Sequence, residues 1–403
     1  MGHSRVLLSS APVALLGHLP FPRHAGAGRH SGTSKKRTTA VLAHVVAPRH
    51  PASGGQVRQL RGLFLHEDEA IFKVILRIKG GGCYEYSLYA RKAQMNCELI
   101  EYGGWKRNIR VSNGRLELII TLDVGPRILH FGACGCGNVF SVFPEQLGRK
   151  ARGKWMLWGG HRLWVAPEHK PRTYELDNGP IELEKIRGGV RVVAPPGPIT
   201  GLQKSIEIRF DDRSNGVEVA HSLTNTLRRP VECAPWALSV MAPRGLAILP
   251  LPPVVSHDDR VTPNQNWSLW SYTDLSDPRI RVGAKFVLIR QDPRRGSTKL
   301  GMAQREGWVG YLRRGELFVK LFARDDRGLY PDGNVNLEVY TDRRILELET
   351  LAPLGVLKPG ASATHKERWH LFQGVPACAS ERDVVKHVTP IMKKLLADRA
   401  RCG

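Results

Sequence analysis

The sequence lacks any run of 18 apolar residues, the length that a helix needs to span a membrane, so a transmembrane class is not expected. Cysteines are scarce, with seven in 403 residues, an odd number without paired spacing. Cys134 and Cys136 are one residue apart, and no second Cys or His pair follows at the spacing of zinc ligands. These absences predict reduced thiols, a cytoplasmic protein without membrane contact, and no bound metal or cofactor.

Acidic residues are absent before Glu67, and residues 1–95 carry 14 Lys and Arg against 4 Asp and Glu. Segment 1–62 is rich in Arg, His, Pro, Gly and Ser and shows no sustained hydrophobic period. We therefore expect residues 1–95 to be a disordered or wrongly assigned N-terminal extension.

Three interpretations of this extension remain open. It could be a signal peptide, with residues 6–17 as the apolar region and residues 25–27 as the cleavage site. Its Arg- and Ser-rich composition also fits a transit peptide. We favour a true start at Met95, because β-strand alternation begins only after that residue. A secreted or periplasmic location is expected only if residues 1–30 are a signal peptide.

The net charge of +23 divides into +10 in residues 1–95 and +13 in residues 96–403. Such an excess occurs in proteins that bind nucleic acid. However, the sequence contains neither a basic helix with interleaved aromatic residues nor a nucleic-acid motif. We interpret the excess as a basic solvated surface and keep nucleic-acid binding as a distant alternative, which predicts steeply salt-dependent binding.

Residues 96–375 show strand patterns throughout. Apolar and polar residues alternate in segments 116–122, 206–210, 217–223, 285–290, 317–321 and 346–351. Turn pairs separate them: Asn113-Gly114, Asn178-Gly179, Asn215-Gly216, Asp332-Gly333 and Pro359-Gly360. Many short strands without a long helical period predict an all-β fold, a large antiparallel β-sandwich.

Residues 376–403 show a helical pattern instead. Residues 380–383 resemble a capping box, and Pro390 is expected to kink the helix. Apolar residues recur at helical spacing: Val384, Val388, Ile391, Met392 and Leu395. We expect this C-terminal amphipathic helix to pack on the sandwich.

The most informative motif is segment 158–168, which reads Trp-Gly-Gly-His-Arg-Leu-Trp-Val-Ala-Pro-Glu. Indole rings can cover the C–H faces of a sugar, and fixed charged donors can hold its hydroxyl groups. A strand–turn–strand with core aromatics and solvated charges would contain the same residue types. On these residues alone, both interpretations stand.

Further segments contribute, together with this motif, to a resemblance to a known family. They are 125–128, 174–181, Asn225 with 235–238, 330–338, 347–351, and His365 with Trp369. Together with the motif, they resemble the galactose-mutarotase-like superfamily, and most closely a bacterial branch of unassigned function. The resemblance implies a β-supersandwich with a sugar-sized groove on its concave sheet, but it does not by itself imply a reaction.

Mutarotation requires a base for the anomeric hydroxyl and an acid for the ring oxygen, and the resemblance implies a Glu and a His. Glu349 lies in a segment similar to the base-bearing strand of the family. Strand alternation places Glu347 and Glu349 on one face, where mutual repulsion would raise one pKa toward a useful value. Glu338 is the alternative carboxylate.

The acid is harder to assign. At the comparable place after Asn225, this sequence has Trp236 where the family has its catalytic His. His161 and His221 remain as candidates. His161, however, lies in a segment similar to the substrate-binding part, and His221 could equally be a core or surface residue. The departure at Trp236 favours binding without catalysis.

Other residues are candidates for sugar contacts. Arg127 and Arg162 offer planar guanidinium donors for hydroxyl or carboxylate groups. The other expected binding residues are Trp158, His161, Trp164, Tyr174, Asp177, Asn178, Trp236, Glu338 and Glu347, and further candidate stacking platforms are Trp267 and Trp270.

The sequence thus predicts a carbohydrate-binding protein. The alternative is an aldose 1-epimerase or related sugar isomerase that uses Glu349 as base and a His as acid. The expected partner is a sugar or sugar derivative, and the basic charge favours an anionic one, such as a uronic acid or sugar phosphate. The sequence indicates neither the identity of the sugar nor the oligomeric state.

Overall fold

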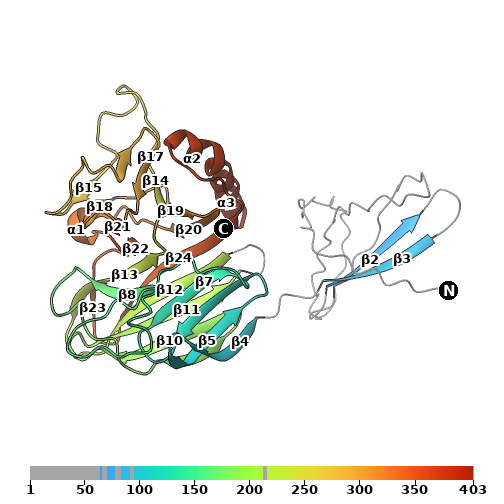
Figure 1. Ribbon diagram of the computed structural model, residues 1–403, viewed down its shortest axis with the longest axis horizontal. Coiled ribbons are helices and arrows are strands. Elements are labelled where there is room, and N and C mark those ends of the chain that lie inside the picture. Colours follow the sequence, from blue (N-terminus) through green and yellow to red (C-terminus); the bar gives the residue numbers. More distant parts are fainter. Residues whose placement is uncertain (1–63, 66–69, 78–82, 91–94, 212–215, 403) are drawn as a thin grey trace, which may run out of the picture. The chain divides into compact units, whose positions relative to one another are not determined.

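The structure, a computed structural model, describes residues 64–65, 70–77, 83–90, 95–211 and 216–402 (Figure 1). The chain divides into two compact units, Met1–Gln94 and Met95–Gly403. The predicted signal-peptide, transit-peptide and disordered features of residues 1–62 lie outside the described residues.

In the first unit, three strands form an antiparallel sheet. They are β1 (Phe64–Leu65), β2 (Ala70–Arg77) and β3 (Cys83–Ala90). They lie in a segment for which the sequence predicted no regular fold. The sequence of β2, Ala-Ile-Phe-Lys-Val-Ile-Leu-Arg, is nonetheless apolar and β-branched, which is typical of strands.

The second unit confirms the predicted all-β fold, because antiparallel strands form two large sheets (Figure 1). The ten-stranded sheet has the order β16 (Ile280–Val282), β17 (Phe286–Arg290), β14 (Leu246–Pro250), β19 (Trp308–Arg313), β20 (Glu316–Phe322), β24 (Ser362–Gln373), β12 (Gly216–Asn225), β11 (Leu202–Phe210), β10 (Gly189–Pro196) and β9 (Glu182–Ile186). The eleven-stranded sheet has the order β15 (Trp267–Leu269), β18 (Thr298–Met302), β21 (Leu337–Thr341), β22 (Leu346–Leu351), β13 (Val231–Met241), β8 (His161–Ala166), β7 (Arg127–Ala133), β6 (Leu116–Thr121), β5 (Trp105–Ser112) and β4 (Asn96–Tyr102), and β23 (Gly355–Leu357) pairs with β13. A short helix, α1 (Pro331–Asn334), precedes β21.

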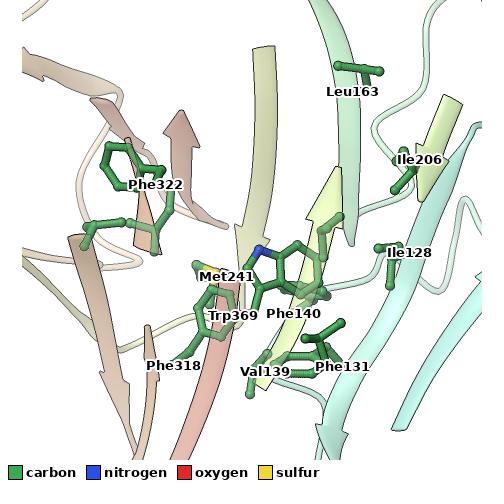
Figure 2. Packing of buried hydrophobic residues seen from close by; sticks show 14 of the residues in the cluster. Ile128, Phe131, Val139, Phe140, Leu163, Ile206, Met241, Phe318, Phe322 and Trp369 are labelled. Carbon is green, nitrogen blue, oxygen red and sulfur yellow. The ribbon is translucent and has the colours of Figure 1, made fainter. Parts of the chain in front are cut away.

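The main hydrophobic core contains alternate residues of strands from both sheets. Figure 2 shows its centre, where Trp369 lies among aromatic rings. The centroid of the Trp369 ring is 5.4 Å from that of Phe131, 5.6 Å from that of Phe140 and 5.8 Å from that of Phe318. Edge-to-face pairs of this kind add about 0.5–1.5 kcal/mol each beyond the area that they bury.

Two C-terminal helices, α2 (Glu381–His387) and α3 (Thr389–Cys402), cover the other face of the ten-stranded sheet (Figure 1). The predicted capping box is present, because Ser380 Oγ accepts from the Asp383 amide and the Asp383 carboxylate accepts from the Ser380 amide. Pro390 lies in the first turn of α3. The predicted kink is therefore a break between two helices, and Val384, Val388 and Met392 pack on the sheet.

The described part of the chain has no helix that combines the length and the hydrophobicity needed to cross a bilayer. Five of the described cysteines are free thiols: Cys97, Cys134, Cys136, Cys233 and Cys378.

Candidate functional site

A row of paired residues runs across five neighbouring strands of the eleven-stranded sheet. Glu338 of β21 is opposite Glu349 of β22, and Glu349 is opposite Leu238 of β13. Leu238 is in turn opposite Arg162 of β8, and Arg162 is opposite Arg127 of β7. Directly paired residues share a face of a sheet. Because the alternate positions of these strands fill the main core, the row lies on the outer face, which we call the site face.

The neighbouring rows of the site face are aromatic and charged. On one side of the first row, Trp236 of β13 is paired with Trp164 of β8. On the other side, Tyr340 of β21 is paired with both Lys299 of β18 and Glu347 of β22. The two-residue period of strands therefore brings predicted aromatic and acidic residues to one face.

The charges of the site face lie in close pairs. Arg162 Nη1 is 2.7 Å from Glu347 Oε1. Lys299 Nζ is 2.6 Å from Glu338 Oε2 and 2.9 Å from Glu349 Oε2. Ionised groups at such buried positions are tolerated because an opposite charge is adjacent, and loss of one partner leaves the other uncompensated.

Indole rings cover both cations. The guanidinium carbon of Arg162 lies 4.2 Å from the ring centroid of Trp164 and 5.4 Å from that of Trp155. Lys299 is held in the same way between two further indoles. Its Nζ lies 4.8 Å from the ring centroid of Trp236 and 4.6 Å from that of Trp270. The site face therefore alternates flat aromatic surface with fixed charge.

Burial raises the pKa values of the central carboxyl groups. The pKa of Glu349 is raised by burial and by the neighbouring Glu347, and Lys299 only partly opposes this shift. The pKa of Glu338 is raised well above its ordinary value, again by burial, with a smaller contribution from Glu349. Because these two carboxyl groups face each other, the pair retains a proton at pH values where exposed glutamates have lost theirs.

Several buried donors at the site face and in the adjoining loop find no acceptor among the described residues. They are Nε of Arg162, the Nε1 atoms of Trp155 and Trp164, and Nε and Nη2 of Arg127. An unsatisfied buried donor costs about 1–3 kcal/mol. Native proteins pair nearly all such groups, so a concentration of them points to a polar ligand or to ordered water.

The groove that the resemblance implied is filled by side chains in this structure. Arg162 and Glu349 are each only 1% exposed. Loop residues cover them, since the ring centroids of Trp155 and Tyr174 lie 5.0 and 5.1 Å from that of Trp164. Access to the charged row therefore requires movement of this cover.

The Gly159-Gly160 turn of the motif is tied to Arg127. Nη1 of Arg127 donates to the carbonyl oxygens of Leu157 at 2.9 Å and Gly159 at 2.7 Å. The guanidinium lies 5.2 Å from the ring centroid of the buried Trp158. Burial lowers the pKa of Arg127 to about 9. Arg127 and Trp158 thus support the loop that carries the motif.

We expect Gly160→Ala to lower the free energy of unfolding by about 2 kcal/mol. Gly160 has a φ of 73°, a conformation that costs an L side chain about 1–2 kcal/mol. A Cβ atom there would also lie 2.2 Å from the Ile128 carbonyl oxygen, so β7 must shift. Urea unfolding measures the loss. Gly153→Ala is the matched control, since its φ is 68° and nothing lies near its Cβ position. Equal losses in both variants would contradict the role of close packing.

The predicted rim residues also hold loops in place. Asp177 accepts from Lys204 Nζ at 2.7 Å. Asn178 accepts from the Ala151 amide at 2.8 Å and donates to the Ala151 carbonyl at 2.7 Å. Tyr174 packs on the indoles described above. These contacts fix the segment that covers the site face.

His161 and His221 lie on the other side of the sheet, in the core. His161 precedes Arg162 in β8, so the two side chains point to opposite faces. Nε2 of His161 lies 2.6 Å from Nε2 of His221, and its Nδ1 lies 2.8 Å from Ser239 Oγ. Nδ1 of His221 faces the carbonyl oxygen of His365 at 3.2 Å, which can only accept. His221 Nε2 is therefore the acceptor, and His161 Nε2 donates to it.

A second group of buried polar residues adjoins these histidines. Glu367 accepts from Lys320 Nζ at 2.8 Å and from Trp369 Nε1 at 2.7 Å. Thr350 donates to Glu367, and its Oγ1 lies 2.7 Å from Nε2 of His365. Burial opposes ionisation of Glu367, but Lys320 and the nearby histidines together lower its pKa to about 2. We call these residues, with His161, His221 and Ser239, the core network.

One group in the described residues has the composition of a metal site. Ligand atoms of His161, His221 and Glu367 lie within 4.8 Å of one another. However, the two Nε2 atoms at 2.6 Å share a proton, and Lys320 already neutralises Glu367. These three groups therefore have partners within the protein.

Glu349 makes no hydrogen bond or ion pair with a histidine among the described residues. In the described residues it accepts from Lys299 Nζ and, at 3.1 Å, from Trp236 Nε1. The alternative function predicted from the sequence, an isomerase, requires a His across a groove from Glu349, but His161 and His221 occupy core positions on the other face of the sheet.

Lys299 of the site face and Trp155 of the loop that covers it were not predicted. Alternation in segment 298–302 could have placed Lys299 opposite the apolar face of its strand. Nothing in the sequence, however, indicates that this strand lies beside the one that carries Glu338. Trp155 lies outside any strand, so no period marks it.

No family model matches this chain, and no match is found among the curated proteins. Among solved structures, a galactose mutarotase-like protein from Lactobacillus casei ATCC 334 is 10% identical, covers 66% of this chain and 100% of its own, and gives a TM-score of 0.45. The Slr1438 protein from Synechocystis sp. PCC 6803 is 10% identical. The match covers 68% of this chain and 99% of the Slr1438 chain, with a TM-score of 0.45.

A protein from Escherichia coli K12, assigned only provisionally as an aldose 1-epimerase, is 13% identical. The match covers 70% of this chain and 100% of that protein, with a TM-score of 0.39. The structural neighbours thus include proteins described as galactose mutarotase-like or as an aldose 1-epimerase. At these identities the likeness concerns the fold alone.

Proposed function

We propose that the site face binds a sugar or sugar derivative. The observation that carries this proposal is the alternation of indole rings with buried charges on one face. Trp164 and Trp236 provide flat apolar surface in one row, while Arg162 and Glu347 provide a donor and an acceptor in neighbouring rows. A sugar ring presents C–H faces to the former and hydroxyl groups to the latter.

The unpaired donors support the same proposal. Nε1 of Trp155 and Trp164 and Nε of Arg162 are buried without an acceptor in the described chain. Hydroxyl oxygens of a bound sugar would accept from these atoms and recover the cost of leaving them unpaired.

Binding requires the cover to open. Trp155 lies in the loop before β8, and Trp270 and Tyr272 lie in the loop after β15. Tyr272 is 45% exposed and marks the rim of this cover. We propose that these loops move away from Arg162 and Lys299 when a sugar enters, as surface loops do more readily than strands.

A second candidate function is an aldose 1-epimerase or related sugar isomerase. It is favoured by the facing pair Glu338 and Glu349, whose raised pKa values allow one group to hold a proton while the other accepts one. In this proposal Glu349 takes the proton of the anomeric hydroxyl and Glu338 protonates the ring oxygen.

The full-length chain should bind at least one sugar from a panel of neutral, acidic and phosphorylated sugars, as measured by calorimetry. We expect Trp155→Ala to weaken that binding at least tenfold, because it removes an indole surface and a donor. Trp267→Ala is the control, since this half-buried indole packs on the main core instead. Equal affinity in both variants, or no binding to any sugar, would refute the proposal.

Polarimetry with an anomerically pure sample of a bound sugar then decides between the two functions. Accelerated mutarotation that Glu349→Gln abolishes would support the isomerase. Binding without acceleration would leave a sugar-binding protein. Equal affinity for neutral and charged forms of one sugar would count against an anionic ligand.

A further inference from the structure

A cavity of about 200 Å³ lies beside strands β14, β16 and β17 of the ten-stranded sheet, and five arginines line it. They are Arg279, Arg281, Arg290, Arg294 and Arg295. We propose that this arginine cavity binds the phosphate groups of a small anionic molecule. It is built on β14, β16, β17 and the segment before α2, and no site-face residue lines it.

The arginines converge from consecutive segments of the chain. Arg281 belongs to β16 and Arg290 to the neighbouring β17. Nη1 of Arg281 donates to the Ala379 carbonyl at 3.2 Å, and Nη2 of Arg290 donates to the Cys378 carbonyl at 3.0 Å. These contacts hold both guanidinium groups beside the segment that precedes α2.

Arg279 is the buried residue of the cavity, with an exposed fraction of 5%. Its Nε donates to Oδ1 and Oδ2 of Asp277 at 3.2 and 3.1 Å, and its Nη2 donates to Oδ2 at 2.8 Å. Its Nη1 is buried and finds no acceptor among the described residues. A buried guanidinium nitrogen without a partner is rare in folded proteins, and here it belongs to a residue that lines a cavity.

The cavity carries an excess of positive charge. Asp277 neutralises Arg279, and Asp292 lies 2.6 Å from Nη2 of Arg294. Arg281, Arg290 and Arg295 form no ion pair within 4.0 Å in the described chain, although the charge of Arg295 acts on Asp277 and Asp292 from a greater distance. The five arginines of the cavity are thus opposed by only two aspartates, so repulsion between like charges remains. An anion that enters relieves this repulsion.

Phosphate fits this environment better than other anions. Guanidinium groups present planar forks of donors that match phosphate oxygens in pairs, and several forks can share one or two phosphate groups. The volume is several times the roughly 30 Å³ of a water molecule, so a diphosphate has room. A concave cavity with a buried arginine favours a terminal phosphate over the continuous backbone of a nucleic acid.

Calorimetry of the full-length chain with inorganic pyrophosphate tests the proposal. We expect saturable binding that the Arg281→Gln/Arg290→Gln double variant weakens at least tenfold, since both residues are exposed and the fold should persist. Arg107→Gln/Arg110→Gln, which removes two exposed arginines from β5, is the charge-matched control and should bind as the wild type does. Absence of binding, or equal weakening in the control, would overturn the proposal.

Two further titrations identify the source of the phosphate. Binding of glucose 6-phosphate or of ADP that pyrophosphate displaces would support the cavity as a site for a sugar phosphate or a nucleotide, respectively. A duplex DNA that displaces pyrophosphate and binds through the same two arginines more tightly than any of these small molecules would overturn it in favour of a nucleic-acid surface.

Discussion

Lys299→Met is expected to lower the free energy of unfolding by about 3–5 kcal/mol, the cost of breaking a buried ion pair from one side. Lys299 is the shared cation of Glu338 and Glu349, at 2.6 and 2.9 Å. The variant leaves two facing carboxyl groups in a buried place without a positive charge. Both must then bind protons or draw in water, and either response destabilises the fold relative to the wild type.

Urea unfolding of the full-length chain at neutral pH measures this effect. Lys366→Met removes a lysine from an exposed position of β24 and should change stability by less than about 0.5 kcal/mol. Adding Glu338→Gln to Lys299→Met should recover part of the loss, because one of the two uncompensated carboxylates is gone. A loss below about 1 kcal/mol in Lys299→Met would mean that solvent reaches this group in solution.

The fold was largely predictable because strand alternation is a local property. Segments 116–122 and 346–351 alternate over most of their length and contain β6 and β22. The capping box at Ser380 depends on four consecutive residues and was also predicted. The strand order was not predictable. β21 and β22 are consecutive and pair as a hairpin, but the pairing of β22 with β13 joins segments far apart in the chain, which no local pattern encodes.

The positions of site residues were predictable only where they follow from alternation within a single strand. Alternation correctly placed Glu347 and Glu349 on one face. The same rule excludes adjacent residues from sharing a face, so Arg162 on the site face requires His161 in the core. The partners of His161, in contrast, come from β12 and β13. They depend on how the two sheets pack, which the sequence does not show.

The two faces of the eleven-stranded sheet are mechanically linked. Thr350 of the core network follows Glu349, and His161 precedes Arg162. Lys320 Nζ also donates to the Leu348 carbonyl oxygen at 3.1 Å, between the two site-face glutamates. The core network thus holds the strands from which the charged row projects.

The free energy of unfolding is expected to fall as the solution is acidified, and His221 is a main cause. Burial lowers the pKa of His221 from 6.5 to about 4. Between these values the unfolded chain binds a proton that the folded chain does not, so the free energy of unfolding decreases as pH falls. One such group contributes about 1.4 kcal/mol per pH unit, or about 3 kcal/mol between pH 6.5 and 4. Burial also lowers the pKa values of His161 and His365, which add in the same direction.

Glu338 and Glu349 act in the opposite direction, because their raised pKa values let the folded chain bind protons that the unfolded chain releases. The pH dependence of the free energy of unfolding of the wild type alone would combine both effects. We therefore expect the difference between wild type and His221→Gln to isolate one histidine. The variant is less stable at pH 7.5, since it loses contacts in the core, but its stability should fall less steeply between pH 6.5 and 4. His257→Gln, at an exposed position, should keep the wild-type slope. Identical slopes in wild type and His221→Gln would show that His221 is not held neutral in the folded state.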